Sequence, residues 1–148
     1  MSWRGTVNHS EIIAAARGWV GTPYRHQASV RGVGCDCLGL VRGVWRELLG
    51  AEPEAVPAYA AGWAEAGGEA LLAGAERHLV PCTDIRGGEV LLFRWRAHLP
   101  AKHAGIAVSP DNMVHAQEDA CVTEIYLSNW WRRHLVCAFR FPGLLPPP

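Results

Sequence analysis

The chain has 148 residues, a length that fits one domain with an ordinary hydrophobic core. Apolar residues make up 49 % and charged residues 19 %, which excludes the composition of a disordered chain. Fourteen Lys and Arg balance fourteen Asp and Glu, so the sequence lacks the basic surplus of proteins that bind nucleic acids. We therefore expect a single domain over residues 1–148, with its core at about 10–141, a proline-rich tail at 142–148 and no nucleic-acid partner.

The apolar runs are short. The longest, such as residues 90–93, fall far below the roughly 20 residues that span a bilayer. The N-terminus shows no apolar segment of the kind found in export signals. These features predict no membrane insertion, and synthesis in the cytoplasm without a Sec-type signal peptide.

Five cysteines are an odd number for a disulfide framework, and their density is low, so we expect them to be mostly reduced. Cys82, Cys121 and Cys137 each stand alone among apolar or strand-like neighbours, which is typical of a free cysteine packed as a small hydrophobic residue. Cys35 is interpreted in the same structural way, although a role as a resolving thiol is conceivable. Cys37 has a different context.

The first half of the chain predicts helices. Residues 9–19 carry an apolar stripe behind the capping candidates Asn8 and Ser10, and residues 21–34 have the composition of a loop. A strong helix follows from Cys37 to about residue 48, with Gly50 as its stop signal. Residues 51–80 predict a loop to about residue 61 and a modest helix over 65–78.

The second half predicts strands, because from residue 88 onward the apolar period changes to two. Helices followed by a run of strands indicate an α+β fold with an antiparallel sheet. The expected strands cover residues 88–95, 104–108, 113–116, 122–126 and 135–141.

Cys37 is predicted to lie in the first turn of the strongest helix. Unpaired amides and the positive end of the helix dipole favour a thiolate there and supply a donor for an oxyanion. We therefore expect the pKa of Cys37 to lie below its ordinary value of about 8.5 and the pKa of a partner histidine to be raised.

His103 and His115 are the candidate partners of Cys37. His103 begins a strand whose same-face residues, Gly105 and Ala107, are small and allow close packing on a helix. If the following hairpin pairs Gly105 with His115, the two imidazoles share one face as diagonal neighbours. A slip of one residue in this register would separate them.

Five motifs occur in the order found in NlpC/P60 cysteine peptidases, and the chain resembles this family over roughly residues 10–140. Within the family it is most similar to the small cell-wall peptidases of phage tails and gene transfer agents. The motifs are Gly21-Thr22-Pro23-Tyr24, Asp36-Cys37-Leu38-Gly39-Leu40-Val41, Gly88-Glu89-Val90-Leu91-Leu92-Phe93, His103-Ala104-Gly105-Ile106-Ala107-Val108 and His115-Ala116.

The resemblance implies a papain-like α+β core in which Cys37 is the nucleophile, His103 the base and His115 the residue that orients it. Tyr24 would contact the oxyanion or the substrate, and Asp36 would bind a substrate amine or simply cap the helix. Many family members have Ser where this chain has Leu38. No metal or organic cofactor is implied.

The resemblance also implies hydrolysis of peptidoglycan stem peptides, typically at the bond between D-glutamate and a diamino acid. Without an export signal, delivery by a phage-tail-like particle to the periplasmic wall of a target cell is the expectation, with a tail hub or baseplate protein as partner. The enzymatic alternatives are an N-acetylmuramoyl-L-alanine amidase and a cytoplasmic enzyme that recycles wall peptides.

Two other classes compete with a peptidase. Cys35, Cys37, His98 and His103 are possible zinc ligands, but their spacing is not that of familiar zinc sites. A structural or binding module of a tail is the non-catalytic alternative, and the adjacent Trp130 and Trp131 could serve its interface.

Overall fold

The computed structural model describes residues 7–54 and 69–143. Two helices come first, with a pair of two-residue strands between them, and six strands with two further helices follow. The elements are α1 (His9–Arg17), β1 (Ser29–Val30), β2 (Gly34–Cys35), α2 (Cys37–Leu49), α4 (Ala70–His78), β3 (Val80–Cys82), β4 (Val90–Phe93), β5 (His103–Ala107), β6 (Asn112–His115), β7 (Thr123–Tyr126), α5 (Asn129–His134) and β8 (Leu135–Arg140).

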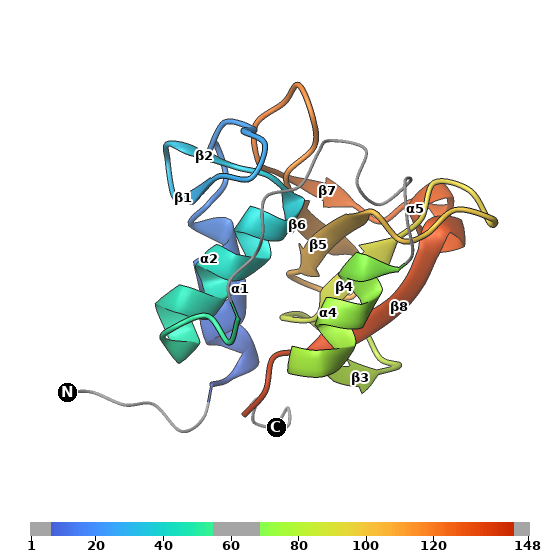
Figure 1. Ribbon diagram of the computed structural model, residues 1–148, viewed down its shortest axis with the longest axis horizontal. Helices are drawn as coiled ribbons and strands as arrows, with labels where there is room; N and C mark the ends of the chain where they lie inside the picture. Colours follow the sequence, from blue (N-terminus) through green and yellow to red (C-terminus); the bar gives the residue numbers. More distant parts are fainter. Residues whose placement is uncertain (1–6, 55–68, 144–148) are drawn as a thin grey trace.

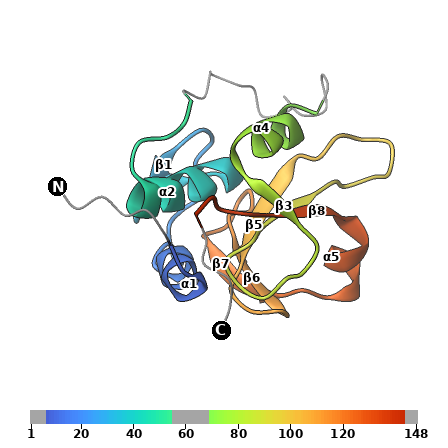
Figure 2. The same ribbon diagram turned by 90° about the horizontal axis from the view of Figure 1, so that it is seen from below.

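The six later strands form one sheet in the order β3-β8-β4-β5-β6-β7, and each neighbouring pair is antiparallel. The expected α+β architecture, with helices before an antiparallel sheet, is confirmed. The sheet is covered on both sides: α1, α2 and α4 pack on one side, and α5 lies on the other (Figures 1 and 2).

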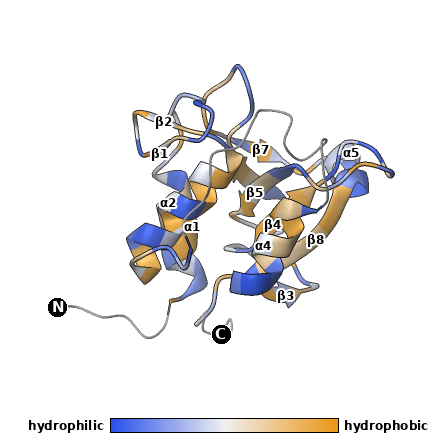
Figure 3. Ribbon diagram, viewed as in Figure 1, coloured by the Kyte–Doolittle hydropathy of each residue, from blue (hydrophilic) through white to orange (hydrophobic). Residues whose placement is uncertain are grey.

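Residues on the two faces of β5 belong to two separate apolar clusters. Ala104 and Ile106 belong to the larger cluster, which includes Leu40 and Val44 of α2. Ala107 belongs to a smaller cluster on the opposite face, which includes side chains from β4 and β6. Because both faces are covered, β4 and β5 are buried along their whole length, and β4 consists of hydrophobic residues only (Figure 3).

The first two helices begin where the sequence supplies caps. Asn8 forms a capping box with Glu11 at the start of α1, and Asp36 caps α2. Gly43 of α2 lies against Trp19, just after α1, and a Cβ at this glycine would lie 2.0 Å from the indole ring. Trp19 itself is buried and donates from Nε1 to Glu47 at 2.8 Å.

Several expectations from the sequence are wrong in detail. The loop expected over 21–34 contains β1 and the first residue of β2, and neither β3 nor α5 was predicted. These elements have two, two, three and six residues, too short to show a period. The described part of the helix expected over 65–78 is α4, and the rest lies outside the described residues, as does most of the proline-rich tail. None of the described helices has the length and apolarity to cross a bilayer.

Candidate active site

Cys37 is the first residue of α2, as the sequence predicted. The preceding residue, Asp36, is buried and uses both carboxylate oxygens: Oδ1 accepts from the amide of Gly39 and Oδ2 from the amide of Gln27, each at 2.7 Å. One side chain thus caps the helix and ties the preceding loop to it. The capping role of Asp36 is confirmed, and binding of a substrate amine stays a prediction.

Gly39 allows the same loop to touch the helix. A Cβ at this position would lie 1.9 Å from the carbonyl oxygen of Ala28. Because that oxygen belongs to the backbone, a change of side-chain rotamer could not remove the clash. Ser29 adds a hydrogen bond of 2.6 Å from its hydroxyl to the carbonyl of Gly39. The glycine two residues after Cys37 therefore fixes the loop beside the thiol.

The Cys37 sulfur lies against the start of β5. Its Sγ is 3.8 Å from the carbonyl oxygen of Lys102, and the backbone N–H of Ala104 is hydrogen-bonded to it. The N–H groups of Cys37 itself and of Leu38 also interact with the sulfur. The thiol thus contacts the main chain on both sides of His103.

His103 and His115 are brought together by the register of the sheet. Gly105 of β5 pairs with His115 of β6, which is the register the sequence analysis required. Nε2 of His103 lies 2.9 Å from Nδ1 of His115, and the two residues are only 5 % and 2 % exposed. The two imidazoles therefore form a buried hydrogen-bonded pair, and the main chain that flanks His103 contacts the thiol.

One expectation about this face is wrong. The small residues Gly105 and Ala107 were expected to pack on a helix, whereas α2 packs against Ala104 and the other residues of the opposite face. A Cβ at Gly105 would instead lie 2.6 Å from the sulfur of Met113. Gly105 thus leaves room for the side chains of Met113 and His115 in the same sheet. The thiol contacts the main chain around His103, where β5 begins.

The expected acidities are reversed. Burial, followed by the negative charge of Asp36, raises the pKa of Cys37 to about 11, although backbone N–H groups oppose this shift. Burial, then His115 and Lys102, lowers the pKa of His103 to about 3, and burial lowers the pKa of His115 to about 4. Desolvation disfavours the charged forms of the partly buried thiol and of the buried imidazoles, so these shifts favour a neutral thiol and neutral histidines at rest.

Tyr24 lies in the same neighbourhood. Its backbone forms an isolated β-bridge with that of Cys35. Burial, followed by the charges of Cys37 and Asp36, raises the pKa of Tyr24 to about 12. The phenol therefore keeps its proton at neutral pH and is available as a hydrogen-bond donor near the thiol. The structure thus brings Tyr24 to the predicted site.

All five cysteines are free, as expected. Burial raises the pKa of Cys35 to about 12, in agreement with its structural interpretation. Cys121 is exposed, so its expected packing as a buried hydrophobic residue is wrong. Within residues 7–54 and 69–143, no three His, Cys, Asp or Glu side chains come together as a metal site.

Aromatic side chains that the sequence analysis did not assign to the site surround the histidines. Trp95 stacks on His103 with ring centroids 5.3 Å apart, and Trp131 of α5 contacts both imidazoles. A signal for Trp95 was present, because it alternates with Phe93, which pairs with His103. Trp131 gave no such signal, since α5 reaches the site only through the tertiary fold.

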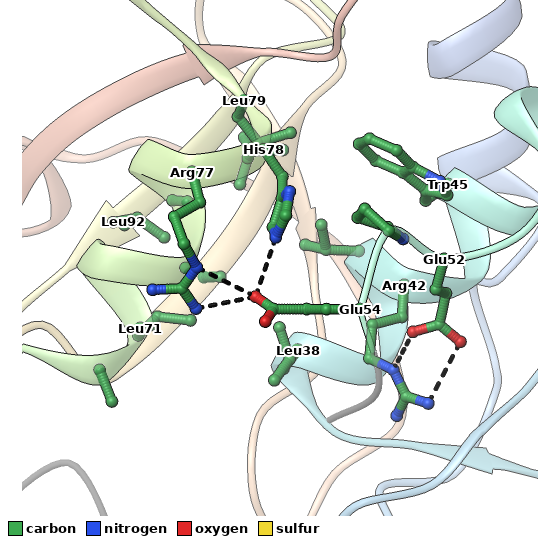
Figure 4. Close-up of a pocket in the computed structure, with 17 residues that line it drawn as sticks. Leu38, Arg42, Trp45, Glu52, Glu54, Leu71, Arg77, His78, Leu79 and Leu92 are labelled. Atoms are coloured by element: carbon green, nitrogen blue, oxygen red, sulfur yellow. Dashed lines mark hydrogen bonds and ion pairs between the residues drawn. The ribbon is translucent and has the colours of Figure 1, made fainter. Parts of the chain in front are cut away.

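A cavity of about 300 Å³ lies between α2, α4 and the sheet (Figure 4). It is lined mainly by apolar side chains, among them Leu38, which follows the thiol, and Ala104, which follows His103. Cys37, His103 and His115 do not line it. At its rim Glu54 binds Arg77 and His78, at 2.7 and 2.9 Å. The cavity thus adjoins the residues that follow Cys37 and His103 in the chain.

Residues 21–140 match the sequence pattern of the NlpC/P60 family, which is more than three quarters of the chain. This chain belongs to the NlpC/P60 family. Among curated proteins, it is similar to the gamma-DL-glutamyl hydrolase of Bacillus subtilis strain 168, at 28 % identity over 137 residues. That similarity covers 92 % of this chain but only 30 % of the hydrolase.

Solved structures of other NlpC/P60 proteins have the same fold. The NlpC/P60 domain of the peptidoglycan hydrolase SagA is 20 % identical, with a TM-score of 0.62, and the match covers 91 % of this chain and all of that domain. An NlpC/P60 protein from Bacillus cereus ATCC 10987 is 16 % identical, with a TM-score of 0.63, over 92 % of this chain and 41 % of its own. These likenesses support the papain-like α+β fold.

Proposed function

We propose that this NlpC/P60 protein is a cysteine peptidase in which His103 accepts the proton of the Cys37 thiol and Sγ attacks an amide carbonyl. The observation that carries the proposal is the placement of the thiol at a helix N-terminus, against the strand end that holds the His103–His115 pair. Nucleophile, base and orienting group then follow the logic of a catalytic triad.

The hydrogen bond between the histidines assigns the ring nitrogens. Nε2 of His103 faces His115, so Nδ1 is the ring nitrogen that we assign as acceptor of the thiol proton. Nε2 must then carry a hydrogen and donate it to Nδ1 of His115. After attack, the protonated His103 gives the proton to the leaving amine, and water hydrolyses the thioester to restore the thiol.

The neutral resting state suits this chemistry. A neutral imidazole is the form that accepts a proton, and the buried pair holds both histidines in that form at neutral pH. Charge develops only as the thiol attacks. The amide of Cys37 and the phenol of Tyr24 are the proposed donors to the oxyanion.

The proposed substrate is a peptidoglycan stem peptide, cut between D-glutamate and a diamino acid. The family assignment supports it, as does the similarity to a protein named as a hydrolase of gamma-glutamyl bonds. Digestion of purified peptidoglycan, followed by mass spectrometry, tests the bond. New N-terminal diamino acid supports the proposal, whereas stems released from the sugar would establish an amidase instead.

The nucleophile has a direct test. Cys37→Ala should abolish release of soluble fragments while circular dichroism stays unchanged, and Cys35→Ala is the matched control, because Cys35 is a buried free thiol only two residues away. Activity that persists in Cys37→Ala would sink the mechanism.

We also propose delivery by a phage-tail-like particle, in contact with a tail hub or baseplate protein, for action on the periplasmic wall of a target cell. Its support is the resemblance of the motifs around Cys37 and His103 to those of tail and gene-transfer-agent peptidases. An antibody against the protein should detect it in purified particles. Detection only as a free cytoplasmic protein would favour recycling of wall peptides.

A further inference from the structure

Three indole rings form a cluster, and two of them contact the imidazole pair. Trp95 follows β4, and Trp130 and Trp131 belong to α5, a helix on the face of the sheet opposite α2. Their centroids lie 5.0 to 6.0 Å from one another. Residues from two distant parts of the sequence thus build one aromatic cluster beside the proposed catalytic histidines.

Trp131 is the indole that contacts both members of the pair. Its ring centroid is 5.7 Å from that of His103 and 5.2 Å from that of His115, the latter in an edge-to-face arrangement at 83°. Phe93 supports Trp131 from the sheet, also edge to face, at 5.0 Å. The indole of Trp131 therefore packs on the core with one side and contacts the hydrogen-bonded imidazoles with the other.

Trp95 and Trp130 differ from Trp131 in what they touch. Trp95 stacks on His103 at 5.3 Å and has no ring contact with His115 among the described residues. Trp130 is 43 % exposed and stacks on His134 at 4.0 Å, with no described ring contact to either catalytic histidine. The neighbouring residues of α5 thus provide a contacting indole and a matched non-contacting one.

We propose that Trp131 is a positioning residue, which holds the His103–His115 hydrogen bond in its productive geometry and excludes water from it. This inference rests on the catalytic roles proposed for the two histidines. Water that reached the pair would compete for the same ring nitrogens and would solvate the imidazolium. The low pKa values of both histidines, caused first by burial, agree with such exclusion.

The charged and titratable groups around the pair are few. After burial, the nearby His115 and then Lys102, directly before His103, lower the pKa of His103. From α2, Cys37 reaches the start of β5. Beside Trp95, Arg94 is bound to the carbonyl of Leu99 and to Glu69. From α5, Arg132 binds Leu127, Pro110 and Asp111, Arg133 is exposed, and His134 stacks on Trp130.

The test follows the imidazoles themselves. In wild type, NMR titration of the ring carbons and nitrogens should show His103 and His115 neutral down to at least pH 5, with resonances assigned from His103→Gln and His115→Gln. Trp131→Ala should raise both midpoints by one unit or more, toward the ordinary value near 6.5. Trp131→Phe should restore most of the shift, and Trp130→Ala should leave both midpoints in place.

Hydrolysis supplies the second measurement. Trp131→Ala should lower kcat about 10-fold or more, leave KM within about twofold and move the acid limb of the rate profile to higher pH. Unchanged midpoints in a folded Trp131→Ala or Trp131→Leu variant, or an equal shift in Trp130→Ala, overturns the inference. If wild type proves inactive but the midpoints shift as expected, the proposed function fails and the positioning role of Trp131 stands.

Discussion

Nε2 of His103 and Nδ1 of His115 lie 2.9 Å apart because the β5–β6 hairpin sets Gly105 opposite His115. The register places both imidazoles on one face of the sheet, and the missing side chain of Gly105 leaves space between the strands for Met113 and His115. A single pairing of a glycine with a histidine therefore builds the proposed base and its orienting partner.

This relationship predicts unequal effects of removing the two histidines. His103→Ala should lower kcat/KM for stem-peptide hydrolysis by about 10²–10⁴-fold, the usual contribution of a general base. His115→Ala should cost less, because His103 can still accept the proton in an unfavourable orientation. Steady-state kinetics measure both, and His115→Asn, which keeps a hydrogen-bonding side chain, should recover part of the loss. An equal loss in both alanine variants would show that His115 does more than orient its neighbour.

The buried histidines also predict acid sensitivity. Their pKa values are lowered in the folded state, so below pH 6.5 the unfolded chain binds protons that the folded chain does not. The free energy of unfolding should therefore fall with decreasing pH, by up to about 1.4 kcal/mol per pH unit for each imidazole. Urea titrations between pH 4.5 and 7 should show a shallower slope in His103→Gln and His115→Gln. A slope equal to that of wild type would contradict the assignment.

The raised pKa of Cys37 predicts that the stability of the protein declines at alkaline pH. Its folded pKa of about 11 lies above the ordinary thiol value, so the folded state keeps a proton that the unfolded state loses as the pH rises above about 9. Stability should fall between pH 9 and 11 in wild type and less in Cys37→Ala. Iodoacetamide labelling gives an independent measurement: at pH 7 Cys37 should react more slowly than exposed Cys121. Fast labelling of Cys37 at pH 7 would show that its thiolate is already formed at rest.

The substitution Asp36→Asn removes the negative charge of this side chain but keeps its cap on α2. The amide oxygen can still accept from Gly39, but the bond from Gln27 is lost, so we expect a cost of about 1 kcal/mol in unfolding free energy. Removal of the negative charge should lower the pKa of Cys37, since Asp36 is the second largest cause of its rise. Alkylation rates against pH measure this. A large rise in KM with unchanged alkylation would instead indicate that Asp36 binds a substrate amine.

Tyr24→Phe removes one proposed oxyanion donor and keeps the ring. We expect kcat to fall by about 10²-fold with little change in KM, because the contact strengthens only in the transition state. Tyr126→Phe, at an exposed tyrosine on β7, is the matched control. Full activity in Tyr24→Phe would leave the backbone amides as the only oxyanion donors.

Two glycines predict opposite changes in stability. Gly74 lies within α4, where a Cβ would only meet the end of Arg77 at 3.7 Å, so Gly74→Ala should stabilise the protein by about 0.5–1 kcal/mol. Gly39→Ala should destabilise it strongly, because the new Cβ collides with the backbone of Ala28 beside the thiol. Thermal unfolding of both variants checks the signs, and a neutral Gly39→Ala would mean that this loop yields easily.

The sequence by itself determined the two main helices, the order of helices before strands, and the three residues of the proposed catalytic centre. Periodicity is a local property, and α2, with thirteen residues, shows it clearly. The position of Cys37 behind a capping Asp36 and the glycine opposite His115 were likewise readable along the chain. The short elements β1, β2, β3 and α5 were not, because they hold too few residues to show a pattern.

Only the tertiary structure decided what surrounds that centre. Whether the thiol is acidic depends on how completely water is excluded, and here burial outweighs the helix N-terminus. Which face of β5 meets α2, and which indoles cover the histidines, depend on the packing of elements far apart in sequence. Local patterns place a residue on a strand or a helix, whereas solvation and long-range contacts exist only once the chain has folded.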